Sequence, residues 1–73
     1  MDGNNIKQNV RERIGLRIST IRKQQCLTQE ELAAKAGLQR THISRIESGN
    51  YAVTIDTLEA IARVLGRHID LIP

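Results

Sequence analysis

The chain has 73 residues, enough for one domain but not for two, and a domain of this size buries only a modest share of its surface. Eleven lysines and arginines against eight acidic residues give a net charge of +3, a mild excess that alone says little about a polyanionic partner. Tyr51 is the only aromatic residue, which argues against the base-stacking surfaces of single-strand nucleic-acid binders and requires an aliphatic core.

The sequence offers little for a disulfide, a metal site or a membrane span. Cys26 is the only cysteine, so no disulfide can form within the chain, and one cysteine with two distant histidines does not make a zinc site. No apolar run is long enough to cross a membrane, and no signal-peptide pattern is present. These features predict a soluble cytoplasmic protein that uses no metal and no other cofactor, with Cys26 as a small, half-buried apolar residue.

Aliphatic residues recur at helical spacing in the first third of the chain, four, four and three residues apart. This spacing predicts a helix over about residues 9–25. We expect residues 1–8 to be a flexible N-terminal segment and residues 9–73 to be a single domain. The stripe on this helix consists of Val10, Ile14, Ile18 and Ile21.

A capping box predicts the start of a second helix. The Thr28 hydroxyl can accept a hydrogen bond from the amide of Glu31, and the Glu31 carboxylate can reach back to the amide of Thr28. Gly37 is expected to end this helix, because glycine is the usual left-handed residue after a helix. The buried face would consist of Leu32, Ala33 and Ala36.

Two further helices are predicted after short breaks. The third begins near Gln39 and ends at Gly49, and the fourth is capped by Thr54 and closed by Gly66. The side chains expected in the core are Ile43 and Ile46 of the third helix, and Ile55, Leu58, Ile61, Ala62 and Leu65 of the fourth.

The C-terminal segment alternates apolar and polar residues from Ile69 onward, which is a short strand pattern. Arg67 and His68 are poor helix caps, which disfavours a fifth helix without excluding it. A single strand cannot pair its own backbone, and no other strand is visible in the sequence, so its partner would be the same strand of a second subunit. The dimerisation residues would be Ile69, Leu71 and Ile72.

These elements predict an all-α bundle of four to five helices. Within it, two short helices joined by a tight turn at Gly37, the second opening on polar and basic residues, describe a helix-turn-helix. In this motif the second helix enters the DNA major groove, where every base pair presents a distinct pattern of donors and acceptors.

Four stretches make the interpretation more specific. They are Leu27-Thr28-Gln29-Glu30-Glu31-Leu32-Ala33-Ala34-Lys35-Ala36-Gly37, Ile43-Ser44-Arg45-Ile46-Glu47-Ser48-Gly49, Thr57-Leu58-Glu59-Ala60-Ile61-Ala62 and Leu65-Gly66. With this spacing the chain strongly resembles the Cro and phage-repressor (XRE-type) helix-turn-helix family over most of its length. The resemblance implies a lambda-repressor-like DNA-binding bundle, and the C-terminal pattern resembles members that dimerise through a short strand.

The resemblance also implies roles for individual residues. Gln29 would bind a DNA phosphate and brace the recognition helix, which is the third helix. Arginine pairs most often with guanine, so Arg40 or Arg45 is expected to read a guanine in each half-site. The base-reading set is Arg40, Thr41, Ser44 and Arg45, and the phosphate-binding set is Gln29, Gln39, Asn50, Tyr51 and Thr54.

Arg22 and Glu47 match a pair that in relatives forms a partly buried salt bridge between the first helix and the end of the third, a structural role. The sequence also departs from the family pattern. Cys26 replaces a common glycine after the first helix, so that helix is expected to end differently, and Gln39 stands where a serine or threonine cap is usual.

The expected function is a sequence-specific, double-stranded DNA-binding transcriptional regulator, a repressor that acts as a homodimer on a palindromic operator with half-sites roughly 34–36 Å apart. The alternative is an antitoxin or other protein-interaction module that binds a separate partner protein, such as a toxin, through the same fold. An enzyme is not expected, because the sequence has no catalytic residues at informative spacing and no glycine-rich phosphate loop.

Overall fold

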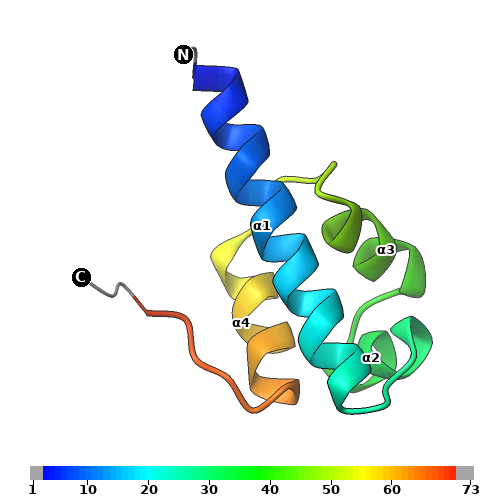
Figure 1. Ribbon diagram of the computed structural model, residues 1–73. Helices are drawn as coiled ribbons and strands as arrows, with labels where there is room; N and C mark the ends of the chain where they lie inside the picture. The colour runs from blue at the N-terminus through cyan, green and yellow to red at the C-terminus, as the bar shows by residue number, and fades with distance from the viewer. Residues whose placement is uncertain (1–2, 71–73) are drawn as a thin grey trace.

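The computed structural model describes residues 3–70 of the chain, with side chains from residue 9 onward, and contains four α-helices in that range. The longest, α1, crosses the whole molecule, and the three shorter helices pack around its C-terminal half, so that its first turns extend beyond them (Figure 1). No helix in the described range is both long and apolar enough to cross a membrane. The helices are α1 (Gly3–Gln24), α2 (Gln29–Ala36), α3 (Arg40–Ser48) and α4 (Ile55–Val64).

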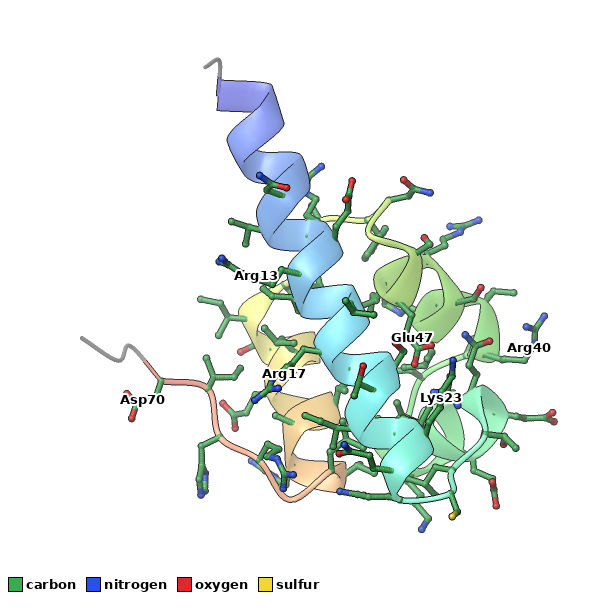
Figure 2. The ribbon with its side chains drawn as sticks, viewed as in Figure 1. Arg13, Arg17, Lys23, Arg40, Glu47 and Asp70 are labelled. Atoms are coloured by element: carbon green, nitrogen blue, oxygen red, sulfur yellow. The ribbon has the colours of Figure 1, made fainter. Side chains whose placement is uncertain are left out.

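The prediction of an all-α bundle is confirmed, with four helices over the described residues. Residues 67–70 form neither a strand nor a fifth helix; they run back beside a groove between α1 and α4. Ile69 lines this groove and is still 45% exposed, and Arg17 lies on the side of α1 that faces the segment (Figure 2). Leu71 and Ile72 lie outside the described residues, so strand pairing across a dimer stays a prediction.

Helix α1 begins earlier than its apolar stripe predicts. It starts at Gly3 and not near residue 9, so the segment expected to precede the helix is helical from residue 3 onward. The difference has a physical reason: apolar periodicity detects only the part of a helix that faces a core, and the first turns of α1 have no other helix beside them (Figure 1).

The capping box of α2 is present as predicted. The Thr28 hydroxyl accepts a hydrogen bond from the Glu31 amide at 3.0 Å, and the Glu31 carboxylate accepts one from the Thr28 amide at 2.8 Å. The hydrogen bonds from the Thr28 backbone and hydroxyl lower the pKa of the Glu31 carboxyl below its usual value. At the other end, Gly37 adopts the expected left-handed conformation, with φ of 73°.

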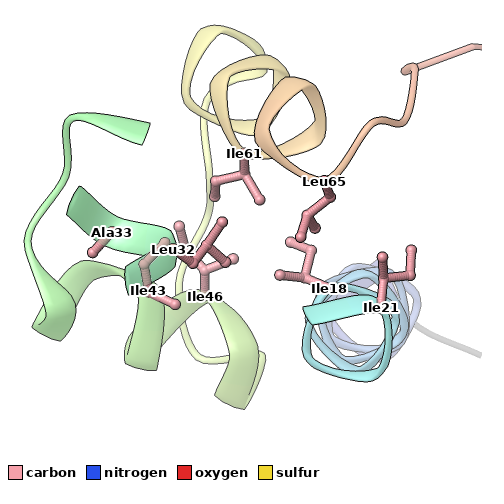
Figure 3. Packing of buried hydrophobic residues seen from close by; sticks show 8 residues of the cluster. All are labelled: Ile18, Ile21, Leu32, Ala33, Ile43, Ile46, Ile61 and Leu65. Atoms are coloured by element: carbon pink, nitrogen blue, oxygen red, sulfur yellow. The ribbon is translucent and has the colours of Figure 1, made fainter. Parts of the chain in front are cut away.

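The core is aliphatic and draws on all four helices (Figure 3). Ile55 and Val10, both expected in apolar stripes, are 74% and 39% exposed. Ile55 is exposed because it lies about 120° around α4 from Ile61, which is at the centre of the buried face. The buried apolar residues are Ile18, Ile21, Leu32, Ala33, Ile43, Ile46, Ile61 and Leu65.

Cys26 was expected to be half-buried and to change the way in which α1 ends, and neither prediction is correct. It is exposed, not half-buried, and its φ of 59° is left-handed, so α1 ends as it would with glycine there. The Leu27 amide donates to the Arg22 carbonyl and the Cys26 amide to the Lys23 carbonyl, both at 3.0 Å. These two bonds form the Schellman arrangement, which requires a left-handed residue at this place whatever its side chain.

We expect Cys26→Gly to raise the free energy of unfolding by about 1 kcal/mol, because glycine adopts the left-handed conformation without the steric cost of a Cβ atom. Urea denaturation under reducing conditions measures the change. Cys26→Ala is the matched control, since it removes the thiol but keeps the Cβ atom, and its stability should match the wild type. An equal gain in both variants would attribute the effect to the thiol.

The Glu31 capping contact predicts a pH dependence. A carboxyl whose pKa is lowered by folding contributes stability above its unfolded pKa, and that contribution is lost as the pH falls through its folded pKa. Glu31→Gln keeps an acceptor but does not titrate there. Between about pH 5 and about pH 2, the melting temperature should therefore fall further in the wild type than in this variant.

The control for this experiment is Glu30→Gln, which removes an exposed acid from the same first turn of α2 without touching the capping box. Its melting temperature should follow the wild type through the acid range. Parallel acid curves for Glu31→Gln and the wild type would contradict the role assigned to the Glu31 carboxylate.

Candidate nucleic-acid interface

Helices α2 and α3 are joined by a turn of three residues. Gly37 ends α2, the Leu38 amide donates to the Ala33 carbonyl at 2.8 Å, and Gln39 takes the N-cap position of α3 in an extended conformation. Gln39 makes no side-chain capping hydrogen bond, as its residue type led us to expect. The observed helix begins at Arg40, so the predicted start near Gln39 is confirmed.

Helix α3 has one buried and one outer face. Ile43 and Ile46 point into the core, whereas the predicted base-reading side chains lie on the opposite surface. Arg40 projects away from the body of the protein (Figure 2). These four side chains span about 140° of the helix surface, which is narrow enough for all of them to face one ligand. The exposed members are Arg40, Thr41 and Arg45, and Ser44 is half-buried.

The outer face of α3 carries only positive charge. Glu47 is the single acid in α3, and its carboxylate is directed inward to Arg22. Arg40 and Arg45 are exposed. A surface with this charge favours a polyanionic ligand over a basic one.

The Arg22–Glu47 ion pair that the resemblance implies is present and almost fully enclosed, with side chains 9% and 7% exposed. The Arg22 Nε donates to one carboxylate oxygen at 2.7 Å and a terminal nitrogen donates to the other at 3.0 Å. The second terminal nitrogen donates to the Leu27 carbonyl at 2.7 Å. The hydrogen bonds to Glu47 raise the pKa of the Arg22 guanidinium despite its burial, so Arg22 stays charged.

Gln29, the first residue of α2, is joined to this ion pair. Its side-chain amide nitrogen donates to Glu47 at 3.0 Å, so the base of α2 is tied directly to the end of α3. The bracing role implied for Gln29 therefore has a contact to support it, while its contact with phosphate stays a prediction. The amide keeps a second N–H group for another acceptor.

The remaining predicted phosphate contacts lie near the loop between α3 and α4. Asn50 is exposed, whereas Tyr51 is half-buried and its ring meets the His42 ring edge-on, with centroids 5.0 Å apart. The Thr54 hydroxyl caps α4 by accepting from the Thr57 amide at 3.2 Å. Because the Thr54 hydroxyl is used in this cap, a phosphate near Thr54 would be bound mainly by the N-terminus of α4.

The surroundings of His42 were not predicted from the sequence. Its Nε2 atom is enclosed and makes no hydrogen bond within the described part of the chain, and the ring packs against Tyr51. No sequence signal marks this contact, because Tyr51 belongs to a different segment. Tyr51 thus lies beside an open hollow along α3. The residues that line this hollow include both predicted base-reading and predicted phosphate-binding side chains. The hollow is lined by Gly37, Leu38, Gln39, Thr41, His42, Arg45 and Tyr51.

The described residues hold no group of three or more histidine, cysteine, aspartate or glutamate side chains that could bind a metal ion. The groups that this surface does present are guanidinium groups, hydroxyls, amides and two helix starts.

The chain is similar in sequence to known helix-turn-helix proteins. The helix-turn-helix family model matches residues 12–72. The chain is 44% identical over 59 residues to the immunity repressor protein of Bacillus phage phi105, covering 81% of this chain but only 41% of that protein. It is 39% identical over 59 residues to control protein C.BamHI of Bacillus amyloliquefaciens, covering 80% of this chain and 73% of that protein.

A solved structure has the same arrangement of helices. The clp gene regulator ClgR from Corynebacterium glutamicum superposes with a TM-score of 0.76 at 26% sequence identity, over 78% of this chain and 61% of that chain. The all-α fold described above is therefore the fold of a helix-turn-helix regulator.

Proposed function

The chain belongs to the helix-turn-helix family, and we propose that it is a transcriptional regulator that binds double-stranded DNA of defined sequence through α3. The observation that carries the proposal is the outer face of α3, where two guanidinium groups and two hydroxyls share one surface with no acid among them. Guanidinium and hydroxyl groups are among the side-chain groups that read base edges in the major groove.

The mechanism follows from the placement of the two helices. With α3 in the groove, Arg40 and Arg45 donate paired hydrogen bonds to guanine O6 and N7, and Thr41 and Ser44 meet neighbouring base edges. Gln29 would donate its second N–H to a backbone phosphate. The phosphate contacts hold the protein in register, while the α3 contacts choose the sequence.

We further propose a repressor that acts as a homodimer on a palindromic operator. A single α3 helix reads only a few base pairs, so two copies on a symmetric site provide the length needed for selective binding. Relatives named as an immunity repressor and a control protein support a regulatory role. The exposed Ile69, beside the apolar groove between α1 and α4, supports an interface that includes the C-terminal segment.

Selection of bound duplexes from a random pool is the primary test. Once an operator is recovered, Arg40→Ala or Arg45→Ala should weaken operator binding by about 10- to 100-fold, because one paired contact to guanine contributes about 1–3 kcal/mol of discrimination. Fluorescence anisotropy at several salt concentrations measures the loss, and operator affinity of the wild type should fall as salt rises.

The matched control is Lys35→Ala, which removes an exposed positive charge from the last turn of α2 and leaves α3 unchanged. Its preference for the operator over random duplex should equal that of the wild type. Unchanged operator binding in both arginine variants would refute the base-reading assignment. If the wild type selects no sequence at all, the protein-interaction module becomes the better interpretation.

The dimer is tested separately by removing residues 69–73. Sedimentation velocity should show a lower dimer fraction than in the full chain, because the exposed Ile69 and the apolar residues that follow it in the sequence are removed. Leu16→Ala, which removes an exposed apolar side chain from α1, is the control and should leave the dimer fraction unchanged. A truncated chain that dimerises fully would remove the segment from the interface, and a monomeric wild type would contradict the homodimer.

A further inference from the structure

Helices α1 and α3 touch backbone to backbone at a glycine. Gly15 lies on the buried face of α1, and a Cβ atom added there would lie 2.6 Å from the Glu47 carbonyl oxygen and 2.9 Å from its carbonyl carbon, and would also clash with the Ile46 carbonyl oxygen. These are backbone atoms in the last turn of α3, so no side-chain rotation can make room for even a methyl group at Gly15.

A second glycine completes the contact from the other side. Gly49, which ends α3 with φ of 80°, is also buried, and a Cβ atom on it would lie 2.8 Å from the Glu12 Cα. Glu12 and Gly15 are neighbours on one turn of α1. The end of α3 is therefore seated directly on one turn of α1, at a closeness that only glycines permit.

Glu47 is held at both ends by this arrangement. Its backbone carbonyl rests against Gly15, and its carboxylate is bound by Arg22 and Gln29. Gly15 and Arg22 are two turns apart, about 10 Å along α1. Two separate contacts on one helix, converging on one residue of the other, fix both the height of α3 above α1 and its rotation. The opposite end of α3 has no side-chain cap.

We propose that Gly15 is a positioning residue for base reading: its missing side chain sets the height at which α3 stands out from α1, and thereby the depth that Arg40 and Arg45 reach in the major groove. This inference rests on the proposed function. An ordinary contact between carbon and a carbonyl oxygen is about 3.3–3.6 Å, so a methyl group at Gly15 displaces the end of α3 by roughly 1 Å.

A displacement of that size affects the two kinds of DNA contact differently. Paired hydrogen bonds from a guanidinium to one guanine keep their strength only over a few tenths of an ångström, and they fix the sequence. Attraction to phosphates depends on charge and changes little over the same distance. Gly15 should therefore control the preference for the operator more than the affinity for DNA in general.

The test compares operator and random duplexes in the same titration, using the full chain. Gly15→Ala should lower the ratio of operator affinity to random-duplex affinity by about 10-fold or more, which corresponds to losing one paired base contact. Affinity for the random duplex should stay within about twofold of the wild type. A role limited to stability would lower both affinities together, through the folded fraction.

Gly66→Ala is the matched control. Gly66 has a left-handed φ of 71°, so alanine there strains the backbone, but none of the surrounding atoms lies within 4 Å of the added methyl group and the contact between α1 and α3 is untouched. This variant should lose stability and keep the wild-type affinity ratio. Circular dichroism at the assay temperature reports the folded fraction of each variant.

Two arrangements keep the test decisive if Gly15→Ala folds poorly. It is assayed in a Cys26→Gly background, which relieves backbone strain in the turn after α1 without changing the residues that touch Gly15, and Glu47→Asp perturbs the same anchor by shortening the side chain that Arg22 holds. An unchanged affinity ratio in folded Gly15→Ala, or in folded Glu47→Asp, overturns the inference while leaving DNA binding intact. A wild type without sequence preference overturns the proposed function, and the inference with it.

Discussion

The ion pair between Arg22 and Glu47 is the constraint on which the arrangement of the helices depends. Two buried charges are tolerated only when their hydrogen-bonding groups are satisfied, and here the guanidinium binds the carboxylate twice and the Leu27 carbonyl once, while Gln29 donates to the same carboxylate. One network thus joins α1, the turn after it, the first residue of α2 and the last turn of α3. Such a pair adds little net stability compared with apolar residues, but losing one partner costs about 3–5 kcal/mol. Packing arrangements that leave any of these charged groups unpaired are therefore disfavoured.

The same ion pair shapes the surface that α3 offers to a ligand. Glu47 is the only acid in α3, and pairing it with Arg22 turns its charge inward, so Arg40 and Arg45 act without a competing carboxylate on their helix. The helix is fixed at its last turn and left uncapped at its first, where Arg40 begins. Under the proposed function, the anchored last turn would hold α3 in place while the side chains near its uncapped first turn meet base edges.

Sequence predicted the elements whose signals are local. The Thr28 capping box and the glycines after α2 and α3 act on their own neighbours along the chain, and each lies where it was expected. The start of α1 was not predicted, because a helix that faces no core needs no regular spacing of apolar residues. Cys26 was misjudged because its left-handed conformation is required by the hydrogen bonds that close α1, not by its residue type. At the site, the family resemblance supplied the residues assigned to the outer face of α3, and the structure places them on one surface of that helix. The contacts of His42 with Tyr51 and of Gly15 with Glu47 join distant segments, and no spacing rule detects them.

The described core also explains why directional contacts matter so much in this chain. Its eight buried apolar residues are aliphatic, and burial of aliphatic surface is non-directional: it drives the helices together without fixing their height or rotation. Aromatic residues, whose edge-to-face preferences add geometry to a core, are absent from this cluster, and Tyr51 only flanks it. Orientation must therefore come from the buried ion pair and from the backbone contact at Gly15. The two kinds of contact therefore do different work. Burial of apolar residues such as Leu32 and Ile61 drives the helices together, whereas the ion pair and the Gly15 contact also fix where α3 stands relative to α1.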